Sequence, residues 1–347
     1  PFVTDAIRQR CENEVLGYTG KPDSYYNAII NWVKQRYDLV VAKEMINFVP
    51  GIVPGIGMAM NCFTQKGDKV MIQPPVYHPF AWVTTRNERT LVINPLKWEN
   101  GMYRMDLDAF REQIKGCKLF ILCNPHNPGG VVWTEAELRA IADICYDEKV
   151  LVFSDEIHAD LTLPPHTHRP FATVCEKARM NSVTFMSPSK AFNMPGLSAS
   201  HALIFNEDLR KRFRIYMDAG ELDMGHVFAF LSVEAAYSHG TEWLDQCLAY
   251  IQGNIDFVDE FLKKHAPKIK AIRPEASYLV WLDCRELELS QKDLNEFFVD
   301  KAHLALNDGE MFGKEGIGFM RLNVASPRCI IEKAMKQLAD AYQLYIK

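Results

Sequence analysis

The chain of 347 residues is long enough for a large hydrophobic core and for two lobes. Its 48% hydrophobic and 24% charged residues are ordinary for a globular protein, and a net charge of −5 argues against nucleic acid or an anionic membrane surface as a partner. No uninterrupted apolar stretch approaches the roughly 20 residues that a bilayer span needs, so we expect no membrane partner.

The first expected element is a helix over residues 4–15. From about residue 68, short β-rich runs alternate with amphipathic helices, which is the pattern of a mainly parallel sheet covered on both faces. The expected strands cover residues 69–73, 91–94, 118–123, 150–154, 183–186 and 202–205. Thr134 and Glu137 form a capping-box pattern at the start of one intervening helix, and Asn206 can cap the helix after the last strand. The predicted fold class is therefore α/β, with a large domain built on this sheet.

The pattern changes after about residue 240. A long helix over about 242–264 leads to a shorter unit of strands and helices. The strands expected in this unit cover residues 269–273, 278–283 and 318–324. We interpret the unit as a smaller α+β domain made of residues 1–17 and 242–347, and we assign residues 18–241 to the large domain.

Lys190 stands in Ser187-Pro188-Ser189-Lys190, directly after the expected strand at 183–186. A lysine at the carboxyl end of a buried strand is unusual, because burying an ammonium costs several kcal/mol unless it is paired or neutralised. Condensation with an aldehyde to form an imine neutralises it, and the hydroxyls of Ser187 and Ser189 suit a phosphate. Both features point to pyridoxal 5′-phosphate as a cofactor that Lys190 carries.

Two other strand ends carry polar residues, and ligands bind beyond the carboxyl ends of the strands in an open parallel sheet. Asp155 follows the strand at 150–154 and can keep the pyridine nitrogen protonated, so that the ring accepts electrons. Asn127, in Asn-Pro-His-Asn-Pro-Gly-Gly, can donate to the phenolate oxygen of the ring. A helix cap is the alternative for Asp155 and a turn residue the alternative for Asn127, while Glu156 fits a structural acid better than a catalytic one.

Four further residues complete the candidate site. The amides of Ile52 and Val53, at the expected start of a helix, can bind the phosphate. Tyr77 follows the strand at 69–73 and can stack on the ring, with plain packing as the alternative. Arg321 lies inside an apolar strand, where its guanidinium fits the α-carboxylate of an amino acid, with an internal ion pair as the alternative. We expect no metal, because the nine cysteines include no Cys-x-x-Cys pattern.

These residues together resemble the fold-type I pyridoxal-phosphate enzymes of the class I/II aminotransferase superfamily. Asn-Pro-x-Asn-Pro-x-Gly, Ser-Asp-Glu-Ile-His and Ser-x-Ser-Lys occur in the family's order and at its separations. With Gly-Tyr-Thr at 17–19 and Phe-Met-Arg-Leu-Asn at 319–323, the chain looks most like the branch of cystathionine β-lyases and cysteine-sulfur lyases that includes the maltose-regulon modulator and cystalysin-type proteins. The resemblance covers nearly the whole chain.

The resemblance implies a homodimer with active sites at the interface, where Tyr18 would act in catalysis by reaching the cofactor phosphate of the other subunit. Two positions depart from the aminotransferase pattern in a way that the lyase branch shares. Ser198 stands where most aminotransferases have an arginine for the phosphate, and His158 stands where many have a tyrosine that touches the phenolate oxygen. Since the chain begins at Pro1, we expect that the family's N-terminal arm precedes it.

The expected reaction is α,β-elimination from a cysteine-type amino acid such as cystathionine, which gives pyruvate, ammonia and a thiol. Lys190 would remove the α-proton, and a thiolate would leave readily because the pKa of a thiol is about 8.5. An aminotransferase is the alternative, and an enzyme with an added regulatory binding role is a further one. Scattered cysteines without a paired pattern indicate reduced thiols and a cytoplasmic location.

Overall fold

The computed structural model describes residues 1–345 and is built around a seven-stranded sheet with the order β1-β9-β8-β7-β6-β2-β3. Its strands are β1 (Ile46–Val49), β2 (Lys69–Ile72), β3 (Thr90–Ile93), β6 (Cys117–Cys123), β7 (Leu151–Asp155), β8 (Ser182–Met186) and β9 (Ser200–Leu203). Strands β3, β2, β6, β7 and β8 run parallel, and β9 is antiparallel to both of its neighbours. The prediction of a mainly parallel sheet is confirmed, and β1 is a strand that it did not include.

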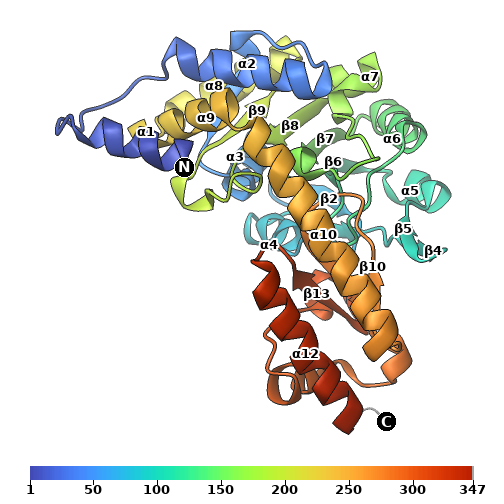
Figure 1. The fold of residues 1–347 in the computed structure, drawn as a ribbon. Coiled ribbons are helices and arrows are strands. Elements are labelled where there is room, and N and C mark those ends of the chain that lie inside the picture. The colour runs from blue at the N-terminus through green and yellow to red at the C-terminus, as the bar shows by residue number, and fades with distance from the viewer. Residues whose placement is uncertain (346–347) are drawn as a thin grey trace.

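Helices cover both faces of the sheet (Figure 1). Alternate residues of a strand point to opposite faces, so Phe153 packs in the cluster of α3, α4 and α8, whereas Val152 packs in that of α5 and α6. The face of Val152 is also covered by α2 and α9. The covering helices are α2 (Asp23–Tyr37), α3 (Ile52–Phe63), α4 (Pro79–Arg86), α5 (Leu107–Gln113), α6 (Glu135–Asp147), α7 (Glu176–Met180), α8 (Glu207–Ala219) and α9 (Val227–His239), and a small hairpin pairs β4 (Lys97–Glu99) with β5 (Met102–Arg104).

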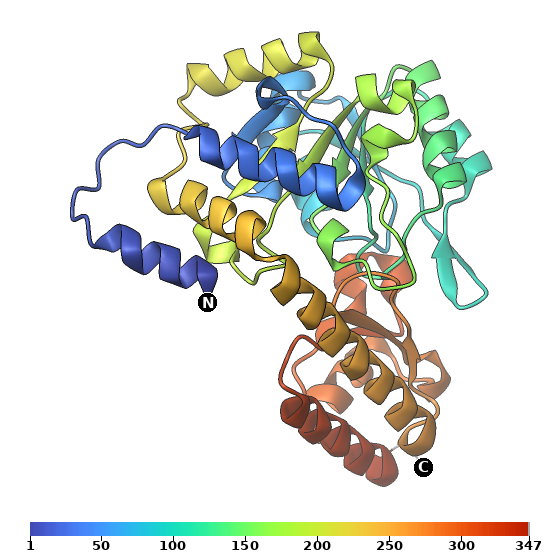
Figure 2. The ribbon, with the colours of Figure 1, turned by 45° about the horizontal axis from the view of Figure 1, so that its top comes forward.

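A smaller lobe follows the long helix α10 (Thr241–His265), which runs from the large lobe along the small one (Figure 2). Its antiparallel sheet has the order β10-β11-β13-β12. The elements are β10 (Lys270–Ile272), β11 (Leu279–Asp283), β12 (Asn307–Asp308), β13 (Phe319–Asn323), α11 (Gln291–Glu296) and α12 (Arg328–Tyr345), which contacts α10. This arrangement confirms the expected smaller α+β part of the fold.

The first helix, α1 (Phe2–Cys11), differs from the expectation that residues 1–17 belong with the smaller domain. It lies against α9, and the ring of Phe2 meets the rings of Phe192 and Trp243 edge-on at 6.0 and 6.3 Å. The contacts with α9 and with the ring of Phe192, which follows β8, hold α1 to the large lobe, whereas Trp243 lies at the start of α10.

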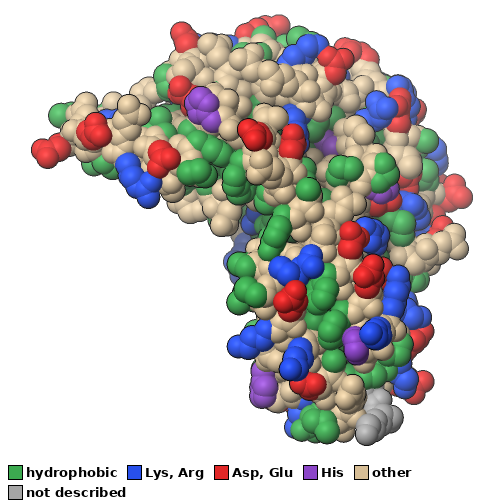
Figure 3. Space-filling view, in the orientation of Figure 1, with side chains coloured by type: hydrophobic (Ala, Val, Ile, Leu, Met, Phe, Trp, Pro, Cys, Tyr) green, Lys and Arg blue, Asp and Glu red, His purple; other side chains and the backbone are tan. Residues whose placement is uncertain are grey.

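The surface carries both signs of charge. In Figure 3, Lys and Arg side chains alternate with Asp and Glu side chains over the visible face of the small lobe. Among residues 1–345, no helix combines the length and the apolar character that crossing a membrane requires.

Candidate active site

A cavity of about 480 Å³ opens beyond the carboxyl ends of β6, β7 and β8. The parallel register sets Cys123 beside Asp155, so the residues that follow these strands meet at one edge of the sheet. Most of the predicted site residues line this cavity, namely Ile52, Val53, Tyr77, Asn127, Asp155, His158, Ser189, Lys190 and Arg321.

Lys190 lies in the turn after β8 and is only partly exposed. Burial lowers the pKa of its ammonium, the positive charge of Arg321 lowers it further, and the carboxylate of Asp155 opposes both effects. A lowered pKa increases the fraction of Lys190 that is uncharged at a given pH, and the uncharged amine is the form that attacks an aldehyde.

Asp155 ends β7 with 3% of its surface exposed, and its carboxylate accepts one hydrogen bond from the backbone N–H of Ile157 at 3.0 Å. Burial raises the pKa of Asp155 to about 7, and the nearby charge of Glu156 adds to the rise, whereas Lys190 lowers it. A carboxylate with this proton affinity is suited to share a proton with a ring nitrogen.

Arg321 reaches the cavity from β13 of the small lobe. Its Nη1 donates to Asn127 Oδ1 at 2.9 Å, and its Nη2 donates to Asn307 Oδ1 at 2.8 Å. Its guanidinium lies 4.6 Å from the centre of the Phe312 ring, and its Nε is buried without a partner. No carboxylate among residues 1–345 pairs with it, so the internal ion pair that was the alternative for Arg321 is not formed.

Burial of Arg321 lowers the pKa of its guanidinium to about 10, which still leaves the group charged at neutral pH. Asn127 accepts from Arg321 through its carbonyl oxygen, and this orientation leaves the amide nitrogen of Asn127 as a donor. The two residues therefore offer one anion site and one neighbouring hydrogen-bond donor.

His158 and Tyr77 form uncharged walls of the cavity. Burial, together with the charges of Lys190 and Arg321, lowers the pKa of His158 to about 3, so its imidazole is neutral. His158 Nδ1 is buried without a partner. Burial likewise raises the pKa of the Tyr77 phenol and keeps it protonated.

The candidate phosphate site lies at the start of α3. The first backbone hydrogen bond of this helix joins Gly55 N to Gly51 O, so the N–H groups of Ile52 and Val53 have no intrahelical acceptor. Ser189 lines the cavity as well.

Ser187 differs from the expectation of a phosphate ligand and does not line the cavity. Its hydroxyl donates to Ala199 O at 2.7 Å and accepts from Ser189 N at 3.1 Å. A hydroxyl engaged with two backbone groups shapes the loop that carries Lys190.

Tyr18 is not brought to the cavity within one chain. It is 97% exposed and does not line the cavity, and the segment between α1 and α2 that carries it projects from the large lobe (Figure 1). The role expected for Tyr18 therefore depends on a second copy of the chain.

Ser198, which stands where most aminotransferases have an arginine, lines the cavity as well. The lining also includes residues that the sequence did not point to: His78, Ser200, Tyr278 and Asn307. His78 directly follows Tyr77 at a strand end, and this position is the signal that could have identified it. Asn307 lies on the two-residue strand β12, for which the sequence carries no local signal.

These groups fit pyridoxal phosphate, which joins an aldehyde, a basic ring nitrogen, a phenolate oxygen and a phosphate. The cavity offers a matching set, because Lys190 supplies an amine, Asp155 a proton-binding acid and Asn127 an amide donor. The unpartnered buried atoms Arg321 Nε and His158 Nδ1 indicate that this wall is built for a polar ligand.

Comparisons with known proteins agree with this geometry. The chain is 37% identical over 341 residues to cystathionine beta-lyase PatB of Bacillus subtilis, and the match covers 98% of this chain and 88% of that protein. The crystal structure of cystalysin from Treponema denticola, which contains pyridoxal 5′-phosphate, has a TM-score of 0.96 at 34% identity and covers 99% and 88% of the two chains.

The pyridoxal-phosphate-bound C-S lyase of Staphylococcus hominis has a TM-score of 0.91 at 33% identity and covers 98% of this chain and 87% of that one. The family model described as aminotransferase class I and II matches residues 3–338, which is nearly the whole chain. The chain belongs to the aminotransferase class I and II family.

Proposed function

We propose that this protein is a pyridoxal-phosphate-dependent carbon-sulfur β-lyase that acts on cystathionine or related cysteine conjugates. The observation that carries the proposal is the convergence of Lys190, Asp155, Asn127 and Arg321 on one cavity. The names of the relatives support the reaction class, since they include cystathionine beta-lyases and C-S lyases.

In the proposed site, Lys190 carries the cofactor, Asp155 binds the ring nitrogen and Asn127 donates to the phenolate oxygen. The N–H groups of Ile52 and Val53 hold the phosphate together with Ser189, while Tyr77 stacks on the ring and His158 lies near the phenolate oxygen. When bound, pyridoxal phosphate supplies an aldehyde that condenses with amines and a protonated ring that draws electrons from the α-carbon of an amino acid.

The chain's own residues then direct the elimination. Arg321 binds the α-carboxylate of the substrate and so fixes the α-carbon beside Lys190. Lys190, whose pKa is lowered by burial, removes the α-proton. Loss of the thiolate from the β-carbon follows, and the product hydrolyses to pyruvate and ammonia.

The cofactor is tested by loading the purified protein with pyridoxal phosphate. We expect a yellow protein whose visible absorbance borohydride removes, with the cofactor fixed to the peptide that contains Lys190 in a mass spectrum. A protein that stays colourless and retains no cofactor would overturn the proposal.

The reaction is tested by incubating the loaded protein with L-cystathionine and assaying pyruvate, ammonia and free thiol in equal amounts. An aminotransferase, the alternative within this family, would need an acceptor keto acid and would release no thiol. Keto-acid-dependent turnover without pyruvate and thiol would replace the lyase by that alternative.

We further propose a cytoplasmic homodimer in which Tyr18 of one subunit completes the site of the other. Tyr18, Val15 and Leu16 are exposed on the projecting segment, and an exposed apolar segment of this kind suits a subunit interface. All nine cysteines are free thiols, which fits a reducing compartment. For the domain division, we propose that the C-terminal part of the smaller domain begins at residue 242, as the sequence predicts.

A further inference from the structure

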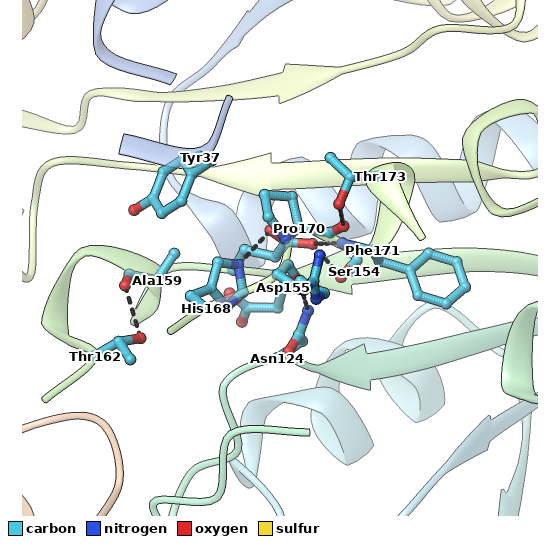
Figure 4. A network of polar contacts seen from close by, with 12 residues as sticks. Tyr37, Asn124, Ser154, Asp155, Ala159, Thr162, His168, Pro170, Phe171 and Thr173 are labelled. Carbon is cyan, nitrogen blue, oxygen red and sulfur yellow. Dashed lines mark hydrogen bonds and ion pairs between the residues drawn. The ribbon is translucent and has the colours of Figure 1, made fainter. Parts of the chain in front are cut away.

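A second buried acid, Glu156, lies directly after Asp155. One of its oxygens accepts hydrogen bonds from Ser154 Oγ and Phe171 N, both at 2.8 Å, and the other lies 2.8 Å from His168 Nε2. Glu156 is 1% exposed and His168 is 4% exposed. Figure 4 shows His168, Ser154 and Phe171 gathered beside Asp155 at the end of β7.

These contacts tie the end of β7 to the loop at 168–171. The same loop is tied to Asn124 after β6, because Asn124 Nδ2 donates to Arg169 O at 3.0 Å. Asn124 is also tied to the end of β7, because its backbone N–H donates to Asp155 O at 2.9 Å. The end of β7 that carries Asp155 is thus held by residues that do not line the cavity, and Glu156 makes three of these contacts.

We propose that Glu156 and His168 are positioning residues for Asp155. These two residues form a buried pair that fixes the turn after β7, so that the Asp155 carboxylate faces the cavity. The inference rests on the proposed function, because it concerns Asp155 as the partner of the pyridine nitrogen. Neither residue contacts the cavity itself, so both act through Asp155.

Charge supports the same relation. The ionisable groups whose charges interact with that of Asp155 are Glu156, Lys190 in the cavity, the Cys123 thiol on β6 and the Tyr77 phenol. Burial is the largest cause of the raised pKa of Asp155, and the charge of Glu156 raises this pKa further. Removing that charge should therefore make Asp155 a weaker proton acceptor.

The first test follows the Asp155 carboxyl in the cofactor-free protein by infrared titration, with Asp155→Asn identifying the band. Glu156→Gln keeps the size of the side chain and removes its charge, and we expect the midpoint of Asp155 to fall by about half a pH unit or more. An unchanged midpoint would overturn the inference.

The matched control is Asp160→Asn, which alters the other buried acid of this turn. Asp160 accepts from Trp32 Nε1 at 2.9 Å and from the Tyr37 hydroxyl, and it is not among the groups that shift the pKa of Asp155. We expect this variant to be less stable with the Asp155 midpoint unmoved. An equal shift in Asp160→Asn would assign the effect to lost stability instead of to Glu156.

The second test measures binding of 4′-deoxypyridoxine 5′-phosphate, which has the ring nitrogen and the phosphate but no aldehyde, to the cofactor-free protein at pH 8. We expect Glu156→Gln to weaken binding about tenfold, and to weaken it less than about twofold in the Asp155→Asn background. Equal weakening in both backgrounds would show that Glu156 does not act through Asp155.

His168→Gln and Ser154→Ala each remove one partner of Glu156. Both variants should also weaken binding of the probe, so they test the inference if Glu156→Gln does not fold.

The two proposals fail in different ways. If the wild-type protein does not bind the probe while the infrared shift occurs, the proposed cofactor is wrong and the link between Glu156 and Asp155 stands. If the probe binds and the Glu156, His168 and Ser154 variants bind it normally, the positioning pair is wrong and the proposed function stands.

Discussion

Burial pushes the ionisable side chains of the cavity toward their neutral forms. It lowers the pKa of Lys190, raises that of Asp155 to about 7 and lowers that of His158 to about 3. In each case the largest cause is the loss of water around the charged form. A ligand that brings a cation to Asp155 and anions to Lys190 and Arg321 would remove this cost, so the cavity is electrostatically prepared for a zwitterionic ligand.

The free energy of unfolding of the cofactor-free protein should depend on pH, because ionising the buried Asp155 carboxyl is unfavourable. Its pKa rises from 3.8 to about 7 on folding, so the folded state holds the proton more tightly, and stability is lost as the pH rises through this window. Asp155→Asn removes the cost and should stabilise the cofactor-free protein by up to about 4 kcal/mol at pH 8. Urea unfolding checks this, and the gain should shrink toward pH 4. A gain that is equal at pH 4 and pH 8 would contradict the origin in ionisation.

Arg321→Ala should impair use of the amino-acid substrate much more than binding of the cofactor. Loss of a buried charged contact costs about 2–5 kcal/mol, so kcat/KM for cystathionine should fall by about 30-fold or more. Asn307→Ala is the matched control, because the Asn127 contact still holds Arg321 there, and its effect should be smaller. Steady-state kinetics and cofactor titration give both values. Unchanged kcat/KM in Arg321→Ala would remove Arg321 from the substrate site.

At the scale of elements, strong local patterns predicted the structure well. The expected capping box is formed, since Thr134 Oγ1 accepts from Glu137 N at 3.2 Å and Glu137 Oε2 accepts from Thr134 N at 2.8 Å. The β-rich runs became strands, and polar residues directly after them face the cavity because parallel strands end at a common edge.

Features set by tertiary contacts were not predictable in this way. Strand β12 has two residues and exists by pairing with β13, so Asn307 was missed. An amphipathic helix indicates that one face is buried but not against which element, so the sequence did not predict the contact of α1 with α9. The sequence also does not tell which serine of a loop faces inward, because that depends on tertiary contacts such as the hydrogen bond from Ser187 Oγ to Ala199 O.

The start of α3 offers a test of the phosphate site that leaves the helix intact. Proline at the first helical position removes an N–H that has no intrahelical acceptor, so Ile52→Pro should preserve α3. Ile52→Ala is the matched control, since both variants lose the buried side chain and only proline loses the donor. We expect pyridoxal phosphate to bind about tenfold more weakly to Ile52→Pro than to Ile52→Ala. Equal affinities would place the phosphate elsewhere.

At the scale of the whole molecule, the cavity is shared by two lobes. Asn127 and Asp155 come from the ends of the large sheet, whereas Arg321 and Asn307 come from the small one. The hydrogen bond between Asn127 and Arg321 joins the two sheets at the cavity, so the relative position of the lobes sets the distance between the cofactor site and the substrate carboxylate.

In the proposed homodimer, the partner subunit contributes to the cavity in addition to the two lobes. Complementation of two inactive variants tests this contribution. Tyr18 is 97% exposed and does not line the cavity of its own chain, so its hydroxyl is free to reach another subunit. In a mixed dimer of Tyr18→Phe and Lys190→Ala, both lesions fall in one site and the other site is intact.

Equal mixing should therefore restore about one quarter of the wild-type activity, because half of the dimers are mixed and each has one good site. Light scattering and exchange of differently tagged subunits establish that mixed dimers form. Full activity of Tyr18→Phe alone would show that the hydroxyl is dispensable. If Tyr18→Phe is inactive and exchange is complete, an unrestored activity would show that Tyr18 acts within its own chain, and the shared site would be wrong.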